Sequence, residues 1–258
     1  MDNVYSHERF VKHMLHFDEY LDYDVAFYVE AAKRQAGPVL ELGCGAGRLL
    51  IPIAQAGCTI TGIEESDLML TALRNRLAGE TEDVSRRVEL VQGDILEKMA
   101  GLGQFALIFI AFNTIWHLEE KAQQECLRVA RQHLAPGGVL IVDVLQPSDL
   151  STFTRTQTCW VHQDSYVQED GTRVHFDITT QLDPLSQVHT VIYRFDEISG
   201  DGTTKSYVVT ERLRYLHYSE LCLMVAMAGL RVTAAYGSHK MDHLTTGSTF
   251  MIICAEVA

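Results

Sequence analysis

The sequence has no excess of basic residues and no long apolar run. Lysine and arginine number 21 against 34 aspartates and glutamates, which gives a formal net charge of −13 at pH 7. A polyanionic partner would meet this negative field, so we expect binding to neither nucleic acid nor an anionic membrane. The longest apolar run, Leu221 to Leu230, has ten residues. A membrane-spanning helix needs roughly 18, so we expect no span.

The sequence also lacks paired cysteines, and we expect no signal peptide. Its six cysteines are scattered singly with no C-x-x-C, and five of them lie among apolar or small neighbours. This pattern favours reduced core residues over a disulfide framework or a zinc site. The N-terminus, MDNVYSHERF, has acidic and polar residues where a signal peptide needs a basic start and an apolar stretch. We therefore expect a cytoplasmic protein.

The 258 residues, 47% of them hydrophobic, are enough for one sizeable core. Between residues 38 and 145 short apolar runs alternate with longer amphipathic segments, as in the βα units of a parallel sheet. Helices are expected between the strands near residues 47–56, 67–78 and 119–134. The five strands are expected at Val39–Leu42, Thr59–Ile63, Val88–Val91, Phe105–Phe112 and Val139–Leu145.

The flanking segments have different periods. Residues 8–36 show helical spacing of apolar side chains with a break around Asp22–Asp24, which predicts a helical cap. A helix over Tyr218–Ala228 and strands near 230–236 and 249–257 would complete the sheet. After residue 150 the period changes to two, which predicts an antiparallel meander near 158–168, 172–182, 188–198 and 204–217.

A glycine-rich turn, Gly43-Cys44-Gly45-Ala46-Gly47, follows the first predicted strand and opens a helix. Glycine lets the backbone turn tightly and approach a ligand without a Cβ clash. The spacing is G-x-G-x-G, and Arg48 stands where the dinucleotide fingerprint requires its third glycine. The turn predicts a small-molecule site, although a bare glycine turn can also be structural.

Two acidic residues follow in the order that an adenosyl ligand requires. Glu64 ends the second predicted strand, 21 residues after Gly43, where a carboxylate can accept both ribose hydroxyl protons. The third predicted strand ends at Gly93, Asp94 and Ile95, where Asp94 can accept a hydrogen bond from an adenine amino group. Taken singly, an acid at a strand end is more often a solvated turn residue. In this order and spacing, the two acids favour an adenosyl ligand.

Together, ELGCGAG, the acid of GIEES, the GD of VQGDI and LAPGGVLIVDV resemble the class I S-adenosylmethionine-dependent methyltransferases over residues 38–145. The resemblance implies an α/β fold: a doubly wound, Rossmann-like, seven-stranded and mostly parallel sheet whose last strand is antiparallel. An N-terminal helical cap would occupy residues 1–36. The methyltransferase core would take 37–150 and 216–258, and an antiparallel β insertion after strand five would take 151–215.

The resemblance also implies S-adenosyl-L-methionine as the cofactor and S-adenosyl-L-homocysteine as its product. Glu65 stands beside Glu64, so the choice between these two carboxylates stays open. The implied cofactor contacts are Glu41, Gly43, Cys44, Gly45, Gly47, Glu64, Glu65, Met69, Gly93, Asp94, Ile95 and Phe112.

A narrower resemblance rests on FNTIWHL, residues 112–118, which is similar to the N-S-F-x-H-L segment of glycine N-methyltransferase-like enzymes and amino-sugar N-methyltransferases. Their acceptor meets the methyl group at this loop. We therefore expect Asn113 to hydrogen-bond the nucleophile and His117 to accept its proton. The alternative is that His117 caps the following helix.

Further side chains are candidates for the acceptor pocket. Trp116 could stack on the acceptor or pack the loop. Tyr20, Tyr23 and Tyr28 could line the pocket as part of a lid, although aromatics at helical spacing are more often core. His239 lies between the last two strands, where substrates enter in the relatives. Its neighbours Asp242 and His243 lack ligand partners at fixed spacing elsewhere, so we expect no metal.

We therefore predict an enzyme, a methyltransferase acting on a small molecule, with N-methylation favoured over O- or C-methylation. The glycine-methylating relatives carry an arginine after strand five where this chain has Leu145 and Gln146. A less anionic acceptor is expected: an amine, a heterocycle, an amino sugar or a hydroxylated natural product. Two alternatives remain. One is a non-methylating S-adenosylmethionine-binding protein or cyclase helper. The other is an NAD-dependent oxidoreductase, although Arg48 and Asp94 do not fit its dinucleotide-binding motif. Assembly as a homodimer is left open.

Overall fold

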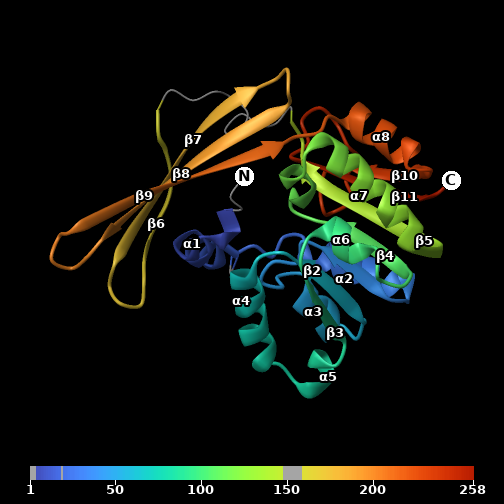
Figure 1. Cartoon of the computed structure of the whole chain (residues 1–258), viewed down its shortest axis with the longest axis horizontal. Coiled ribbons are helices and arrows are strands. Elements are labelled where there is room, and N and C mark those ends of the chain that lie inside the picture. Colours follow the sequence, from blue (N-terminus) through green and yellow to red (C-terminus); the bar gives the residue numbers. More distant parts are fainter. Residues whose placement is uncertain (1–3, 19, 148–158) are drawn as a thin grey trace. The chain divides into compact units, whose positions relative to one another are not determined.

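The computed structural model describes residues 4–18, 20–147 and 159–258 (Figure 1). The chain divides into two compact units: Met1–Asp149 together with Leu216–Ala258, and Leu150–Tyr215. The contacts thus place residues 1–36 in the same unit as the α/β core. The second unit holds the strands of the predicted β insertion.

The first unit is built on a seven-stranded sheet in the order β10-β11-β5-β4-β1-β2-β3. Its neighbouring strands are parallel, except that β11 runs antiparallel to both β10 and β5. This confirms the predicted fold class. The strands are β1 (Val39–Leu42), β2 (Ile60–Glu64), β3 (Val88–Gln92), β4 (Phe105–Ile110), β5 (Leu134–Leu145), β10 (Leu230–Tyr236) and β11 (Phe250–Val257).

Two layers of helices accompany this sheet. Helix α6 packs on α7 and α7 on α8, while α2 packs on α3 and α3 on α5. None of the described helices is long and apolar enough to cross a membrane. The helices are α1 (Glu8–Asp18), α2 (Val25–Gln35), α3 (Leu50–Gln55), α4 (Asp67–Ala78), α5 (Glu82–Ser85), α6 (Ile95–Met99), α7 (Glu120–His133) and α8 (Tyr218–Met227), with the short 3-10 helices η1 (Val4–Ser6) and η2 (Thr114–His117).

The core lies against the central strands. In β4, with the sequence FALIFI, every residue except Ala106 is buried. Strands covered on both faces need apolar side chains throughout, so β4 shows no alternation. Phe109 belongs to a cluster with Tyr28 of α2 and Leu50 of α3, and its ring centroid lies 4.6 Å from that of Tyr28. The central strands are therefore held rigidly, with their carboxyl ends in fixed positions.

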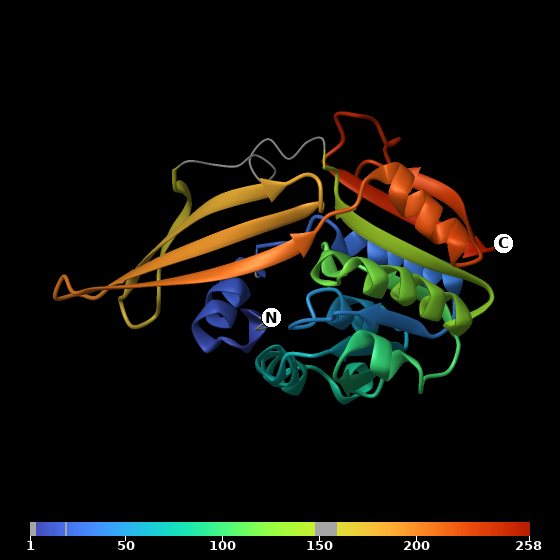
Figure 2. The same ribbon diagram turned by 45° about the horizontal axis from the view of Figure 1, so that its top comes forward.

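The second unit is a four-stranded antiparallel sheet in the order β6-β7-β8-β9 (Figure 2). Phe176, Phe195 and Tyr207 stack across three strands, with centroid distances of 4.8 and 5.0 Å. Asp170 and Asp201 stabilise two of its turns. Each aspartate accepts a hydrogen bond from the backbone N–H of the residue two positions further along the chain. The strands are β6 (Val161–Val167), β7 (Arg173–Asp183), β8 (Val188–Ile198) and β9 (Thr204–Arg214).

The predicted strands all form, but some boundaries differ. The fourth strand ends at Ile110 rather than Phe112, because Phe112 and Asn113 have φ values of 51° and 62° and cannot continue a strand. The fifth strand begins at Leu134 rather than Val139. The short helices α5, α6 and η2 were not expected, since one turn is too short to show a helical period. Residues 148–158, which include the start of the predicted meander, lie outside the described residues.

Candidate active site

The glycine turn connects the carboxyl end of β1 to α3. Gly43, Gly45 and Gly47 have φ values of 78°, 52° and 81°, which L side chains rarely adopt. A Cβ on Gly43 would also collide with the Thr114 side chain, whereas a Cβ on Gly45 would meet only the Met69 methyl carbon, at 3.9 Å. Gly45 therefore has open space beside it, as expected of a backbone that a ligand approaches.

Glu64 joins this turn to the end of β2. Its Oε2 accepts a hydrogen bond from the Gly45 N–H at 2.9 Å, and its Oε1 accepts one from the Ser66 N–H at 2.8 Å. Burial raises the pKa of Glu64, and these hydrogen bonds oppose the shift. Each carboxylate oxygen can accept more than one hydrogen bond, so both can still accept from hydroxyl groups. Glu65 is exposed, which distinguishes the two carboxylates that the sequence left open.

Asp94 lies at the end of β3, where it is the N-cap of α6. Its Oδ1 accepts hydrogen bonds from the N–H groups of Leu96, at 2.8 Å, and Glu97, at 3.1 Å. The helix therefore uses one oxygen and leaves Oδ2 to other donors. Ile95, the first helical residue, has a backbone N–H in the first turn, where no intrahelical partner exists.

Three of the expected cofactor contacts have buried side chains. Met69 and Val11 of α1 pack with Ala46 of the glycine turn, so α1 lies beside the turn. The Cys44 side chain is buried, and a Cβ on Gly62 would approach its Sγ. Glu41 is 4% exposed, and burial raises its pKa well above the usual range, with the charge of Arg48 acting in the opposite direction.

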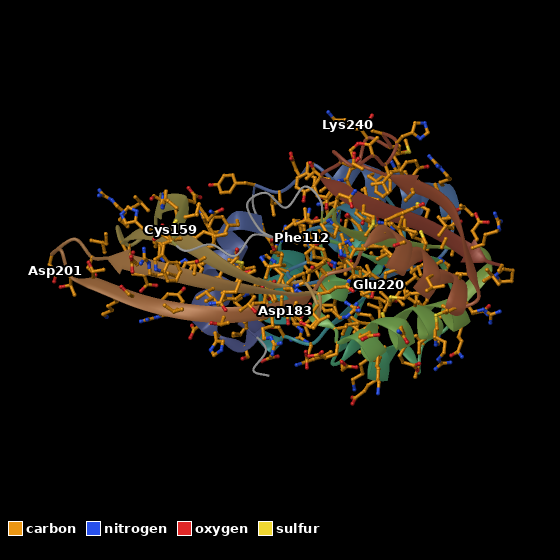
Figure 3. The ribbon with its side chains drawn as sticks, turned by 90° about the horizontal axis from the view of Figure 1, so that it is seen from above. Phe112, Cys159, Asp183, Asp201, Glu220 and Lys240 are labelled. Atoms are coloured by element: carbon orange, nitrogen blue, oxygen red, sulfur yellow. The ribbon has the colours of Figure 1, made fainter. Side chains whose placement is uncertain are left out.

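The loop after β4 carries the acceptor candidates. Phe112 is 47% exposed (labelled in Figure 3) and its ring lies 5.3 Å from the Arg48 guanidinium. Asn113 is held by β5: its N–H donates to the Asp143 carbonyl at 3.1 Å, and its Oδ1 accepts from the Leu145 N–H at 2.7 Å. This hydrogen bond fixes the side chain of Asn113, whose amide NH₂ group can donate to the molecule that receives the methyl group.

His117 and Trp116 of the same loop differ in exposure. His117 is exposed at the end of η2, with the Tyr5 ring 5.8 Å from its own. The N-cap position of α7 is taken by Glu119, two residues beyond the histidine that we weighed as a cap. Trp116 is 2% exposed. Its ring packs inside the loop, as the second of the two interpretations predicted, and offers no face to an acceptor.

Arg48, next to the glycine turn, makes a bidentate ion pair with Asp24. Its Nη2 lies 2.8 Å from Asp24 Oδ2, its Nη1 bonds Oδ1, and Nη1 also donates to the Leu21 carbonyl at 3.2 Å. The pair connects the segment between α1 and α2 to the cofactor turn. Sequence reasoning missed it, because Asp24 was only part of a predicted helix break.

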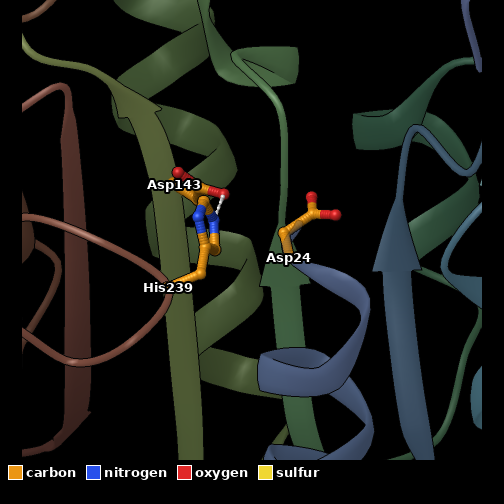
Figure 4. Close-up of side chains that lie close together, drawn as sticks. All are labelled: Asp24, Asp143 and His239. Carbon is orange, nitrogen blue, oxygen red and sulfur yellow. Dashed lines mark hydrogen bonds and ion pairs between the residues drawn. The ribbon is translucent and has the colours of Figure 1, made fainter. Parts of the chain in front are cut away.

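Asp143 at the end of β5 forms a second polar cluster, which sequence reasoning also missed. Its Oδ2 accepts hydrogen bonds from the Tyr28 hydroxyl at 3.1 Å and from His239 Nε2 at 2.8 Å (Figure 4). Ligand atoms of Asp24, Asp143 and His239 lie within 4.8 Å of one another, as a metal site would require. The cation beside Asp24, however, is the Arg48 guanidinium, which binds both of its oxygens.

The remaining acceptor candidates separate by burial. Tyr28 is fully buried, so the expectation that it lines the acceptor pocket is wrong; it is a core residue that anchors Asp143. Tyr20 is 72% exposed. The His239 side chain is 4% exposed, with rings of Tyr23 and Phe250 at 5.3 and 4.7 Å from its own. Tyr23, the third tyrosine expected in the lid, is 44% exposed.

The fold and the site together define a class of protein. The sheet is doubly wound with one antiparallel strand, and a glycine turn and acids lie at the carboxyl ends of adjacent strands. Open α/β sheets bind ligands at this edge, where the strand order reverses between β1 and β4. Such a protein binds an adenosyl compound there and acts on a second molecule beside it.

Comparison with known proteins agrees with this class. A family model described as a methyltransferase domain matches residues 39–138. The cypemycin N-terminal methyltransferase of a Streptomyces species is 26% identical over 222 residues, covering 84% of this chain and 82% of the relative. A dTDP-3-amino-3,4,6-trideoxy-alpha-D-glucopyranose N,N-dimethyltransferase of Streptomyces venezuelae is 28% identical over 121 residues, 46% of this chain and 47% of the relative.

A solved structure is similar over nearly the whole chain. The CcbJ methyltransferase from Streptomyces caelestis has a TM-score of 0.75 and 28% identity, covering 93% of this chain and 92% of that one. The protein is a class I S-adenosylmethionine-dependent methyltransferase, similar to small-molecule N-methyltransferases. The family match covers Arg48 and Asp94, the two residues that argue against an NAD-dependent oxidoreductase.

Proposed function

We propose that the enzyme transfers a methyl group from S-adenosyl-L-methionine to a nitrogen atom of a small molecule. The observation that carries this proposal is the hydrogen bond between Glu64 and the Gly45 N–H. It places a partly buried carboxylate beside an open glycine backbone at the ends of two adjacent parallel strands. The names of the two relatives described above support nitrogen as the methylated atom, because one is an N-terminal methyltransferase and the other an N,N-dimethyltransferase. Two ubiquinone biosynthesis O-methyltransferases of Caulobacter also match, each over 42% of this chain.

The cofactor residues fit an adenosyl ligand in our proposal. Glu64 receives the ribose hydroxyl groups, Oδ2 of Asp94 receives the adenine amino group, and the backbone at Gly45 and Ile95 completes the contacts. We assign Glu65 no direct contact, since it is exposed. The side chains of Cys44 and Met69 shape the turn from inside the protein.

The cofactor, when bound, supplies a methyl group already activated on a sulfonium. What remains for the chain is to align the nucleophile, exclude water and receive a proton, and alignment alone can supply roughly 7–11 kcal/mol. We assign alignment to the Asn113 amide and proton acceptance to His117, which is exposed at the mouth of the loop. Phe112 and Tyr20, both exposed, are proposed to cover the acceptor.

The acceptor is proposed to carry little negative charge. The segment after β5 presents Gln146, whose side-chain amide donates to the Thr245 carbonyl at 3.2 Å and is thereby engaged within the protein. No cationic side chain stands at positions 145 and 146 to hold a carboxylate. An amine, a heterocycle or an amino sugar fits this surface better than glycine does.

The first experiment is calorimetric titration with S-adenosyl-L-methionine, S-adenosyl-L-homocysteine and NAD. We expect the two adenosyl compounds to bind and NAD to give no heat. Gly45→Val should abolish binding, whereas Gly202→Val, at another left-handed glycine in the β insertion, controls for backbone strain. Asp94→Ser keeps a helix cap but removes the carboxylate, so it should weaken binding without loss of α6. Binding of NAD alone would refute the proposal.

Acceptors are then screened by formation of S-adenosyl-L-homocysteine. The panel is a 3-amino-3-deoxyhexose, an imidazole, a short peptide with a free α-amino group and, as an oxygen nucleophile, catechol. Methylation of an amine in this panel is the expected result. If the cofactor binds and no acceptor is methylated, the non-methylating alternative gains support. His117→Gln should lower turnover, and full turnover across the pH range would exclude its role as a base.

Two further expectations remain proposals. A homodimer is checked by sedimentation velocity at two protein concentrations, where a single concentration-independent monomer boundary would exclude it. The cytoplasm remains the proposed compartment on the sequence grounds given above.

A further inference from the structure

Asp143 connects three segments that are distant in the sequence. Through its backbone it holds the loop after β4, since its carbonyl accepts the Asn113 N–H at 3.1 Å. Two residues on, the Leu145 N–H donates to Asn113 Oδ1 at 2.7 Å. Asn113 is thus fixed to β5 at two points, Asp143 and Leu145.

The carboxylate of Asp143 is held just as firmly. It is 3% exposed, and its Oδ2 accepts hydrogen bonds from Tyr28 of α2 and from His239 of the segment between β10 and β11. Burial and the Asp143 charge raise the pKa of Tyr28 far above its usual range, so its phenol remains a donor. Because a carboxylate has no proton to give, His239 carries its proton on Nε2 in this contact.

The loop needs such support. Phe112 and Asn113 are two consecutive non-glycine residues with positive φ, 51° and 62°. Conformations of this kind persist only where the surroundings enforce them. The hydrogen bonds from β5 to Asn113 supply that constraint, and they hold only as long as the end of β5 keeps its place.

We infer that Asp143 is a positioning residue for methyl transfer: its carboxylate, held by Tyr28 and His239, fixes the end of β5 and thereby the loop that presents Asn113 and His117 to the acceptor. This inference rests on the proposed function of that loop. It assigns Asp143 no contact with either substrate. A misplacement of about 1 Å at a reacting group can cost about 100-fold in rate, so such a residue affects turnover without touching the chemistry.

A tryptophan within the loop can report how exposed the loop is. Trp116 lies within it, and the only other tryptophan in the chain is Trp160. In a Trp160→Phe background, acrylamide quenching therefore reports the exposure of Trp116 alone. Asp143→Ala should raise the quenching constant by about two-fold or more, because the loop loses its fixed support. Asp143→Asn, which keeps an oxygen acceptor, should stay near the parent value.

Two variants control the measurement. Asp83→Ala removes an exposed carboxylate of α5 and should change nothing. If Asp143→Ala does not fold, as judged by its thermal transition, the double variant Tyr28→Phe with His239→Leu removes both donors instead and should also raise quenching. Unchanged quenching in whichever of these variants folds, or an equal rise in Asp143→Asn and Asp143→Ala, would overturn the inference.

The second readout is kinetic and uses the amine acceptor found in the screen. In Asp143→Ala kcat should fall about ten- to 100-fold, while calorimetry gives a dissociation constant for S-adenosyl-L-homocysteine close to that of the parent. Asp143→Asn should restore most of kcat. A change in quenching without a change in kcat would contradict the positioning role. If the parent enzyme methylates no acceptor, the proposed function fails, and the quenching result still decides whether Asp143 fixes the loop.

Discussion

The ion pair between Arg48 and Asp24 should contribute strongly to stability because it is buried. The Arg48 side chain is 11% exposed and that of Asp24 is 1% exposed. Arg48→Met keeps much of the apolar stem and removes the guanidinium, so the Asp24 carboxylate is left buried and unpaired. Breaking one partner of a buried pair costs about 3–5 kcal/mol. We expect a loss of that size in the free energy of unfolding, measured by urea denaturation followed by far-ultraviolet circular dichroism.

A bidentate ion pair on the surface provides the control. Arg128 and Glu125 also form a bidentate pair, but their side chains are 50% and 43% exposed. Arg128→Met should therefore change stability little, since water solvates the remaining charge. The double variant Arg48→Met with Asp24→Asn should recover part of the loss, because no buried charge stays unpaired. A loss in Arg48→Met as small as that in Arg128→Met would refute the reasoning.

Three further predictions concern the turn, pH and metals. Gly43→Ala should lower the free energy of unfolding by about 1–3 kcal/mol and weaken S-adenosyl-L-homocysteine binding, because its Cβ would collide with a neighbour in a left-handed backbone. Gly57 is also left-handed but has open space around it. Gly57→Ala should therefore destabilise less in unfolding experiments and leave calorimetric binding intact. Burial of His189, in β8, lowers its pKa from 6.5 to about 4. The stability that its neutral form contributes is therefore fully present above pH 6.5 and is lost as the pH falls towards 4. That contribution is about 3 kcal/mol, and His189→Leu should flatten the dependence of the urea midpoint on pH across this window; an unchanged slope would count against it. Because Arg48 already neutralises Asp24, dialysis against a chelator should leave the thermal midpoint and cofactor affinity unchanged, and a midpoint raised by added Zn²⁺ would show otherwise.

The fold was predictable because its signals are local. The apolar runs that became β1 to β5 are each bounded by glycine, proline or a helical period. Gly43, Gly45 and Gly47 stand out in sequence for the same reason that they matter in space, since each has a φ value that side chains resist. Predicted strand boundaries were wrong where the backbone conformation has no signature in the sequence, as at Phe112.

The site was predictable only in part, because its buried polar groups depend on distant partners. Tyr28 and His239 lie 115 and 96 residues from Asp143, and a single aspartate in the apolar run LIVDV gives no hint of either. Helical spacing likewise cannot separate Tyr20, which is exposed, from Tyr28, which is buried. Charge pairing such as that of Asp24 with Arg48 becomes visible only once the helices are placed.

The Arg48–Asp24 pair also bears on where this enzyme can be shortened. The family match begins at residue 39, so a fragment cut there would keep Arg48 in the interior and discard Asp24. The same cut would remove Tyr28 and leave the Asp143 carboxylate with one donor fewer. The α1–α2 segment therefore completes the electrostatics of the catalytic unit, and a minimal enzyme must begin ahead of Asp24, well upstream of the first strand.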